Sequence, residues 1–129
     1  MESFLIVLLN NYFAVLKKYM VFSGRSSRKE FWFFALVNFV VGIIFSILTK
    51  IPILKIIFWI VYFLYGLAIL IPSITVGIRR LHDTNRTGWL MLLCLVPFVG
   101  AIAVLVLCAL EGTPGENQYG SVPSENAVM

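Results

Sequence analysis

The stretch IIFWIVYFLYGLAILIPSITVGI, residues 56–78, contains 23 consecutive residues without a charged side chain. Two similar stretches flank it, FWFFALVNFVVGIIFSILT at residues 31–49 and GWLMLLCLVPFVGAIAVLVLCAL at residues 88–110. A helix of 19 to 23 residues is roughly 28–35 Å long, which matches a bilayer hydrocarbon core of about 30 Å. Because lipid offers the backbone no hydrogen-bond partners, such segments cross it as helices. The sequence therefore predicts an all-α fold with three transmembrane helices, 31–49, 56–78 and 88–110.

The composition of the 129-residue chain agrees with a lipid environment. Hydrophobic residues make up 60% of it and charged residues only 12%, whereas a soluble domain carries about 25% charged residues. So few charged side chains cannot cover a globular surface. The composition therefore disfavours a soluble enzyme, a disordered regulator and a secreted disulfide scaffold. The length fits one membrane domain, residues 1–129.

Residues 3–19 form a shorter segment of a different kind. Its apolar part, residues 4–16, is about 20 Å long as a helix, too short to span a bilayer. The polar residues form two heptad-spaced rows on about 120° of one face: Ser3, Asn10 and Lys17, and Asn11 and Lys18. This pattern predicts an amphipathic helix in the membrane surface, with its lysines toward lipid phosphates. A short tilted fourth span is the alternative.

Lys and Arg are unevenly distributed among the segments. Five precede the first span, two lie between the first and second, three lie between the second and third, and none follows residue 110. Three spans place eight of these cations on one side and two on the other. The positive-inside rule then predicts a cytoplasmic N-terminus and an external polar tail, residues 111–129. A third segment that re-enters, broken at Pro97-Phe98-Val99-Gly100, would instead return the tail to the cytoplasm.

The informative polar residues gather in two loops on the predicted cytoplasmic face. GRSSRKE, residues 24–30, leads into the first span, and RRLHDTNR, residues 79–86, follows the second. One interpretation is that these cations set the topology and attract anionic lipid. The candidate site residues are Arg25, Arg28, Glu30, Arg79, Arg80, His82, Asp83 and Arg86.

A more specific hypothesis makes these residues a network. Glu30 and Asp83 would pair with Arg28, Arg79 or Arg86 and so tie the two loops together. The remaining guanidinium groups would hold a lipid phosphate or an acidic partner segment, because Arg offers a planar fork of donors.

The sequence predicts no catalytic, metal or cofactor site. His82 and Asp83 are adjacent, so they do not face each other on a helix, and no nucleophile accompanies them. Two cysteines and one histidine disfavour a metal site, and Cys94 and Cys108 are about 21 Å apart along one helix, too far for a disulfide. No nucleic-acid partner is expected, because the cations lie in the headgroup plane.

Three motifs resemble the DUF805 family of small bacterial inner-membrane proteins. They are FSGRSSRKEFW at residues 22–32, RRLHDTNRTGW at residues 79–89 and GTPGENQYG at residues 112–120, followed by Pro123. The resemblance implies a multi-pass inner-membrane protein, and it implies no activity because the family is defined by unknown function. It adds weight to Arg25, Arg28, Glu30, Arg80, His82 and Asp83. A tail that docks on the other two motifs would share their face, which the charge count opposes.

The expected function is that of a non-enzymatic membrane protein whose charged cluster contacts anionic lipid or a partner protein. An oligomeric transporter or channel component is the alternative, with a path lined by Asn38, Ser73 and Thr75; the same small and polar residues are also typical of helix packing. A membrane enzyme acting on lipid headgroups is a second alternative.

Overall fold

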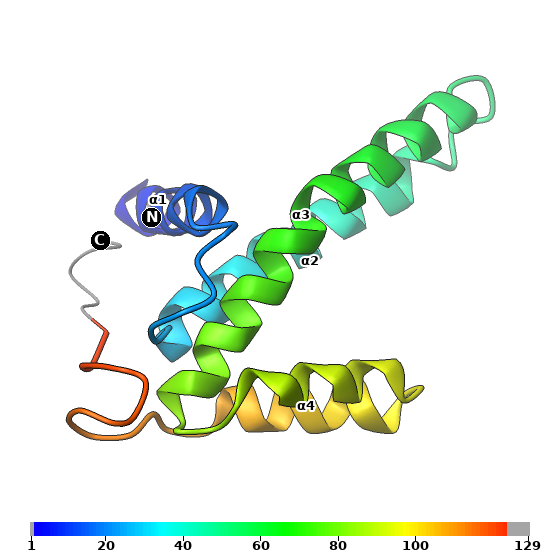
Figure 1. Ribbon diagram of the computed structural model, residues 1–129. Coiled ribbons are helices and arrows are strands. Elements are labelled where there is room, and N and C mark those ends of the chain that lie inside the picture. The colour runs from blue at the N-terminus through cyan, green and yellow to red at the C-terminus, as the bar shows by residue number, and fades with distance from the viewer. Residues whose placement is uncertain (1, 124–129) are drawn as a thin grey trace.

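The computed structural model describes residues 2–123, and every regular element within that range is a helix. These elements are α1 (Glu2–Lys17), α2 (Arg28–Leu48), α3 (Lys55–Asp83), the 3-10 helix η1 (Gly88–Leu95) and α4 (Val99–Ala109). Figure 1 shows two arms that diverge from a common end, a long arm made of α2 and α3 and a short arm made of η1 and α4. The all-α fold expected from the sequence is confirmed.

The long arm corresponds to the first two predicted spans. Both of its helices are long and apolar enough to cross a membrane. At the start of α2, the Ser27 side chain caps the helix by accepting a hydrogen bond from the Glu30 amide at 3.1 Å. At the same end of the arm α3 continues past residue 78 to Asp83, so the RRLHD motif forms its last turns. Asn85, with a φ of +61°, then ends the helix in the left-handed conformation.

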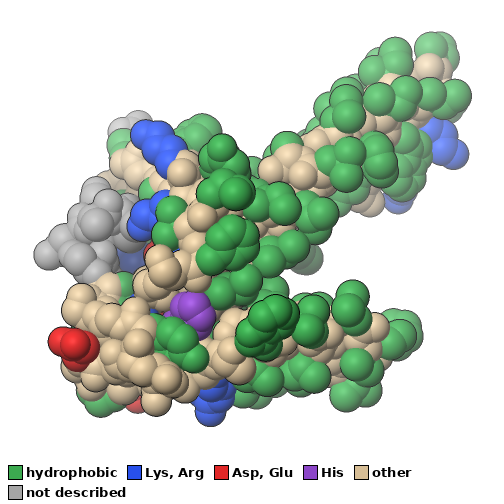
Figure 2. Space-filling view, in the orientation of Figure 1, with side chains coloured by type: hydrophobic (Ala, Val, Ile, Leu, Met, Phe, Trp, Pro, Cys, Tyr) green, Lys and Arg blue, Asp and Glu red, His purple; other side chains and the backbone are tan. Residues whose placement is uncertain are grey.

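The surface of both arms is apolar. Figure 2 shows hydrophobic side chains covering them, with most of the charged side chains at the common end and at the far tip of the long arm. Phe39 on α2 and Phe63 on α3 are each more than 60% exposed. An apolar surface of this extent is typical of a face that contacts lipid or another protein rather than water.

Residues 88–110 do not form the single spanning helix that the sequence predicted. The chain turns back at residues 96–98, and η1 and α4 lie side by side as a hairpin (Figure 1). Each leg is about 16 Å long, roughly half the hydrocarbon thickness of a bilayer. The expectation of a continuous helix is therefore wrong for this segment, and the alternative of a broken, re-entrant segment describes its shape.

The turn of the hairpin depends on Pro97, Phe98 and Gly100. Pro97 has no amide hydrogen to donate, and Phe98 adopts a φ of +61° so that the Val99 amide donates to the Pro97 carbonyl at 2.7 Å. At Gly100, a Cβ would lie 1.6 Å from the carbonyl oxygen of Leu93. Only glycine therefore lets the two legs approach this closely. Backbone amides that donate to carbonyl groups within the hairpin do not need water as a hydrogen-bond partner. A membrane environment imposes this condition, because lipid offers the backbone no partners.

The N-terminal helix α1 packs on the long arm. The side chains of Leu8, Tyr12 and Val15 are buried, and Tyr12 stacks on Phe34 of α2 with ring centroids 5.2 Å apart. The predicted polar face is divided by this contact. Ser3, Asn10 and Lys17 are exposed as one row, whereas Asn11 is fully buried and its side-chain amide donates to the Glu30 carbonyl at 3.0 Å.

Replacement of Gly100 by alanine tests the hairpin. We expect Gly100→Ala to lower the free energy of unfolding by about 1–3 kcal/mol, because the new methyl group collides with the backbone of η1. The measurement is denaturant unfolding in detergent micelles, followed by helical circular dichroism.

The matched control is Gly66→Ala on α3, where a Cβ meets nothing within 4 Å. Equal stability of the two variants would contradict the close approach of the hairpin legs.

Candidate functional site

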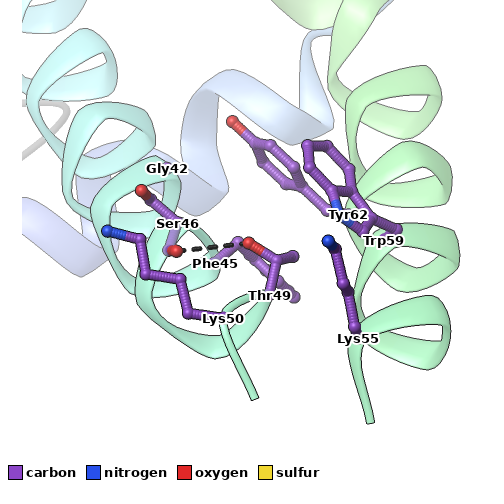
Figure 3. A pocket seen from close by; sticks show the side chains of 8 residues that line it. All are labelled: Gly42, Phe45, Ser46, Thr49, Lys50, Lys55, Trp59 and Tyr62. Atoms are coloured by element: carbon purple, nitrogen blue, oxygen red, sulfur yellow. Dashed lines mark hydrogen bonds between the residues drawn. The ribbon is translucent and has the colours of Figure 1, made fainter. Parts of the chain in front are cut away.

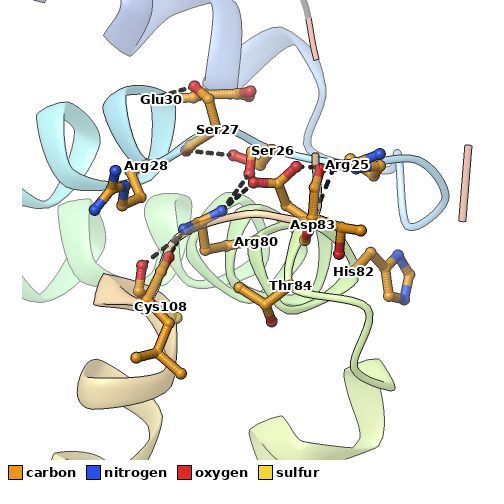
Figure 4. Close-up of polar contacts among 12 residues, drawn as sticks. Arg25, Ser26, Ser27, Arg28, Glu30, Arg80, His82, Asp83, Thr84 and Cys108 are labelled. Carbon is orange, nitrogen blue, oxygen red and sulfur yellow. Dashed lines mark hydrogen bonds and ion pairs between the residues drawn. The ribbon is translucent and has the colours of Figure 1, made fainter. Parts of the chain in front are cut away.

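Charged side chains from two distant segments, and backbone carbonyl groups from a third, meet at the common end of the two arms. Five residues there form a cluster that we call the ionic hub: Arg25, Glu30, Arg79, Arg80 and Asp83. Each of the five is at most 8% exposed. Figure 4 shows how the loop before α2, the last turn of α3 and the end of α4 converge on it. The hub therefore lies inside the protein and not on its surface.

Asp83 is the centre of the hub. Its Oδ1 accepts from Arg25 Nε at 2.9 Å, and its Oδ2 accepts from Arg80 Nη1. The neighbouring Gly112 belongs to the tail, and a Cβ at that position would lie 2.0 Å from Oδ2. One carboxylate therefore joins two guanidinium groups, and the tail passes directly against it.

Arg25 connects the hub to the tail. Its Nη1 donates to the Gly115 carbonyl at 2.6 Å and to the Gly120 carbonyl at 3.1 Å, and its Nη2 donates to the Thr113 carbonyl at 2.6 Å. With Asp83 on Nε, every nitrogen of this guanidinium group has an acceptor. Arg25 thus fixes the path of residues 113–120 and has no donor nitrogen left over for a phosphate group.

Arg80 connects the hub to the short arm. Its Nε donates to the Cys108 carbonyl at 2.8 Å and its Nη2 donates to the Leu110 carbonyl, while Nη1 reaches the Ser26 carbonyl at 3.1 Å. The last carbonyls of a helix have no partner within the helix and carry the negative end of its dipole. A buried cation at this point therefore satisfies the end of α4 and attaches the hairpin to α3.

Glu30 and Arg79 form a second ion pair beside the first. Arg79 Nη1 donates to Glu30 Oε2 at 2.7 Å, and both side chains are buried. The Ser26 amide also donates to the Arg79 carbonyl at 2.9 Å. Arg79 Nε and Nη2 are buried without a hydrogen-bond partner among the described residues. The pairing of Glu30 with Arg79, one of those expected from the sequence, is present.

His82 holds the tail in a different way. Its Nδ1 donates to the Gly24 carbonyl at 2.9 Å, which fixes the tautomer with the proton on Nδ1. The ring stacks on Tyr119 with centroids 4.0 Å apart and planes 3° apart. The Asn117 side chain donates to the His82 carbonyl at 3.0 Å. His82 is therefore packed between two loops and points away from Asp83, as Figure 4 shows.

Arg28 and Arg86 do not join the hub. The Arg28 side chain is exposed and reaches only the Ala109 carbonyl, at 3.5 Å. The half-buried Arg86 donates to the Thr84 carbonyl at 3.2 Å. The expectation that one of these arginines pairs with Asp83 is wrong, because Arg25 and Arg80 already occupy both carboxylate oxygens.

Sequence reasoning missed the residues that supply backbone acceptors and the aromatic partner of His82. Thr113, Gly115, Gly120 and Cys108 act through their carbonyl groups, which no side-chain pattern identifies. Tyr119 and Asn117 lie in the tail motif, and that motif was the available signal. Three arginines against two carboxylates leave the hub with one formal positive charge, which the carbonyl oxygens offset.

The arrangement is suited to holding segments of the chain together. Apart from Nε and Nη2 of Arg79, the hub guanidinium nitrogens are directed at internal acceptors, and no serine or cysteine nucleophile is hydrogen-bonded to His82 in residues 2–123. Within the same range, no group of three or more His, Cys, Asp or Glu side chains is arranged to hold a metal ion.

The three segments that form the hub all fall in a region that matches a known family. A model for the protein family of unknown function DUF805 matches residues 19–121. The chain belongs to the DUF805 family. It is 46% identical over 112 residues to inner membrane protein YhaI of Escherichia coli K12, which covers 87% of this chain and 93% of YhaI.

A second relative leads to the same class. Inner membrane protein YhaH of the same organism is 40% identical over 119 residues, covering 87% of this chain and 94% of YhaH. No solved structure matches the chain. The expected class, a DUF805 membrane protein, is confirmed.

The hub also corrects the expected position of the tail in this DUF805 protein. Residues 113–120 contact Arg25 and His82, and the Thr113 amide donates to the Asp83 carbonyl at 2.7 Å. The described part of the tail therefore lies at the same end of the long arm as residues 24–30. The three-span count would place these two segments on opposite membrane faces, and their direct contacts do not agree with that prediction. Residues 124–129 of the predicted tail lie outside the described range.

Neutralising Asp83 tests the hub. We expect Asp83→Asn to lower the free energy of unfolding by about 3–5 kcal/mol, because two buried guanidinium groups lose their shared counter-charge. Thermal unfolding in detergent, followed by circular dichroism, measures the change.

The matched control is Glu111→Gln, which removes an exposed carboxylate from outside the hub. If the two variants unfold at the same temperature, Asp83 does not hold the segments together.

Proposed function

We propose that this protein is a non-enzymatic, multi-pass inner-membrane protein that presents cations to anionic lipid at the cytoplasmic face. The observation that carries the proposal is a division among its cations. Arg25, Arg79 and Arg80 are buried in the hub, whereas the seven other cations are exposed or half-buried and lie outside the ion pairs of the described residues, five of them at or near the common end. We call these five the basic rim: Lys17, Lys18, Arg28, Lys29 and Arg86.

The orientation follows from the same cations. The hub and the basic rim together hold eight Lys and Arg residues at or near the common end, and the loop between α2 and α3 holds two, Lys50 and Lys55. The re-entrant hairpin does not alter this count, because no Lys or Arg follows residue 110. The positive-inside rule favours a cytoplasmic common end, with both the N-terminal loop and the tail inside.

Recognition of lipid by the basic rim has a simple physical basis. Anionic headgroups attract a cation near the surface by about 1 kcal/mol each. Lys17 is exposed at the end of α1, where the apolar side chains Leu9 and Phe13 are also about half exposed. An exposed face of this mixed kind is typical of a helix that lies at the boundary of headgroups and acyl chains.

The proposed lipid contact is tested with a charge-neutral variant. We expect Lys17→Gln, Lys18→Gln and Arg28→Gln, combined, to bind phosphatidylglycerol at least about tenfold more weakly than the parent, because three surface cations are lost. Native mass spectrometry of the delipidated protein titrated with lipid gives the affinity.

The matched control keeps the charges with Lys17→Arg, Lys18→Arg and Arg28→Lys, and should bind like the parent. Unchanged affinity in the neutral variant would remove the basis of the proposal.

The proposed orientation is tested by labelling with a membrane-impermeant maleimide. In a protein with Cys94 and Cys108 replaced by alanine, we expect Ile53→Cys to react in intact cells and Ser121→Cys to react only after permeabilisation. Both positions are exposed, Ile53 in the loop between α2 and α3 and Ser121 in the tail. Labelling of Ser121→Cys in intact cells would place the tail outside and contradict the orientation.

A further inference from the structure

We propose that a pocket at the far tip of the long arm binds the phosphate of an anionic lipid from the leaflet opposite the hub. The pocket has a volume of about 440 Å³ and opens between the end of α2 and the start of α3. Figure 3 shows Lys50 reaching it from one helix end and Lys55 from the other. This inference concerns a different leaflet from the basic rim and does not rest on the lipid contact proposed there.

The pocket carries a local positive charge, and none of the described residues that line it is a carboxylate. Lys50 and Lys55 are exposed and take part in none of the three ion pairs of the described residues. The ion-paired carboxylates, Glu30 and Asp83, belong to the opposite ends of α2 and α3. Two ammonium groups at one pocket mouth attract a group with negative charge, and they supply six N–H donors for its oxygens.

Hydroxyl groups line the same pocket between the lysines. Ser46 is exposed there, and Thr49 lies beside it, with its Oγ1 donating to the Ser46 carbonyl at 3.2 Å. The Ser46 hydroxyl can donate to a bound oxygen atom. Hydroxyl and ammonium donors that line one pocket are the groups from which a phosphate diester accepts hydrogen bonds.

The apolar part of the pocket favours a lipid over a free anion. Phe45 of α2 and Tyr62 of α3 stack with ring centroids 5.0 Å apart and form one wall. Trp59 lines the mouth and is 53% exposed, and an indole of this kind prefers the headgroup level of a membrane. A free phosphate ion gains nothing from these aromatic groups, whereas a lipid places its glycerol and first methylene groups against them.

The position of the pocket relative to the long arm agrees with this occupant. Ile47 and Ile56 flank the two lysines in sequence and are 62% and 73% exposed. Charged side chains beside exposed apolar ones, at the end of a helix pair long enough to cross a membrane, mark the boundary between acyl chains and headgroups. The pocket therefore lies at the depth in the bilayer at which lipid phosphate groups are found.

The experiment uses the full chain in nanodiscs that contain a photoactivatable phosphatidylglycerol, with cross-links mapped by peptide mass spectrometry. We expect cross-links to residues 45–62 in the parent, and a yield roughly ten- to thirtyfold lower in Lys50→Gln with Lys55→Gln, because two surface cations are lost. The charge-preserving pair Lys50→Arg with Lys55→Arg should restore the yield. A photoactivatable phosphatidylcholine should give little cross-linking there.

The controls separate this site from the basic rim and from free anions. The neutral rim variant, with Lys17, Lys18 and Arg28 replaced by glutamine, should keep its cross-links at residues 45–62. An unchanged yield in the Lys50 and Lys55 glutamine variant, or equal cross-linking by phosphatidylcholine, overturns the inference. Complete suppression by inorganic phosphate at the concentration of the lipid assigns the pocket to a free anion and overturns the lipid occupant. Circular-dichroism melting establishes that every variant is folded.

Discussion

The structure depends on the shared ion pair in which Asp83 joins Arg25 and Arg80 away from water. Burial of a charged side chain destabilises the folded state unless the charge is paired and hydrogen-bonded. Here the remaining guanidinium donors are directed to backbone carbonyls of the tail and of the end of α4. A single carboxylate therefore fixes three otherwise independent segments: the loop before α2, the short arm and the tail. The same contacts explain why the buried charged residues of this apolar chain lie in one cluster, where each has a partner of opposite charge.

The short arm shows how membrane physics and local sequence act together. Each leg is too short to span a bilayer, yet the backbone at the turn must still find partners within the protein. Phe98 accepts an unfavourable backbone conformation, and the Val99 amide thereby gains an acceptor. At the base of the hairpin, Arg80 and Trp32 both donate to the Cys108 carbonyl. The polar requirements at both ends of the hairpin are therefore met by this chain itself.

The division between buried and exposed cations separates stability from recognition. The hub arginines hold the fold, and their donors are directed at internal acceptors, apart from two on Arg79. In the functions proposed above, the basic rim and the two lysines at the far tip meet anionic groups in the two leaflets. The charged motif at residues 79–86 therefore contains residues with different roles: Arg80 and Asp83 are structural, whereas Arg86 lies after the end of α3 and does not join the hub.

The sequence by itself determined the apolar long arm, the gathering of charge at one end and the family, because hydrophobic run length and motif order are local properties. It also indicated the Glu30–Arg79 pair, one of several combinations left open. Only the tertiary structure decided that Arg25 and Arg80 occupy Asp83, that residues 88–110 fold back on themselves and that the tail returns to the hub. Those outcomes depend on backbone carbonyls brought together from distant segments and on the close contact at Gly100, and neither leaves a periodic or compositional pattern in the chain.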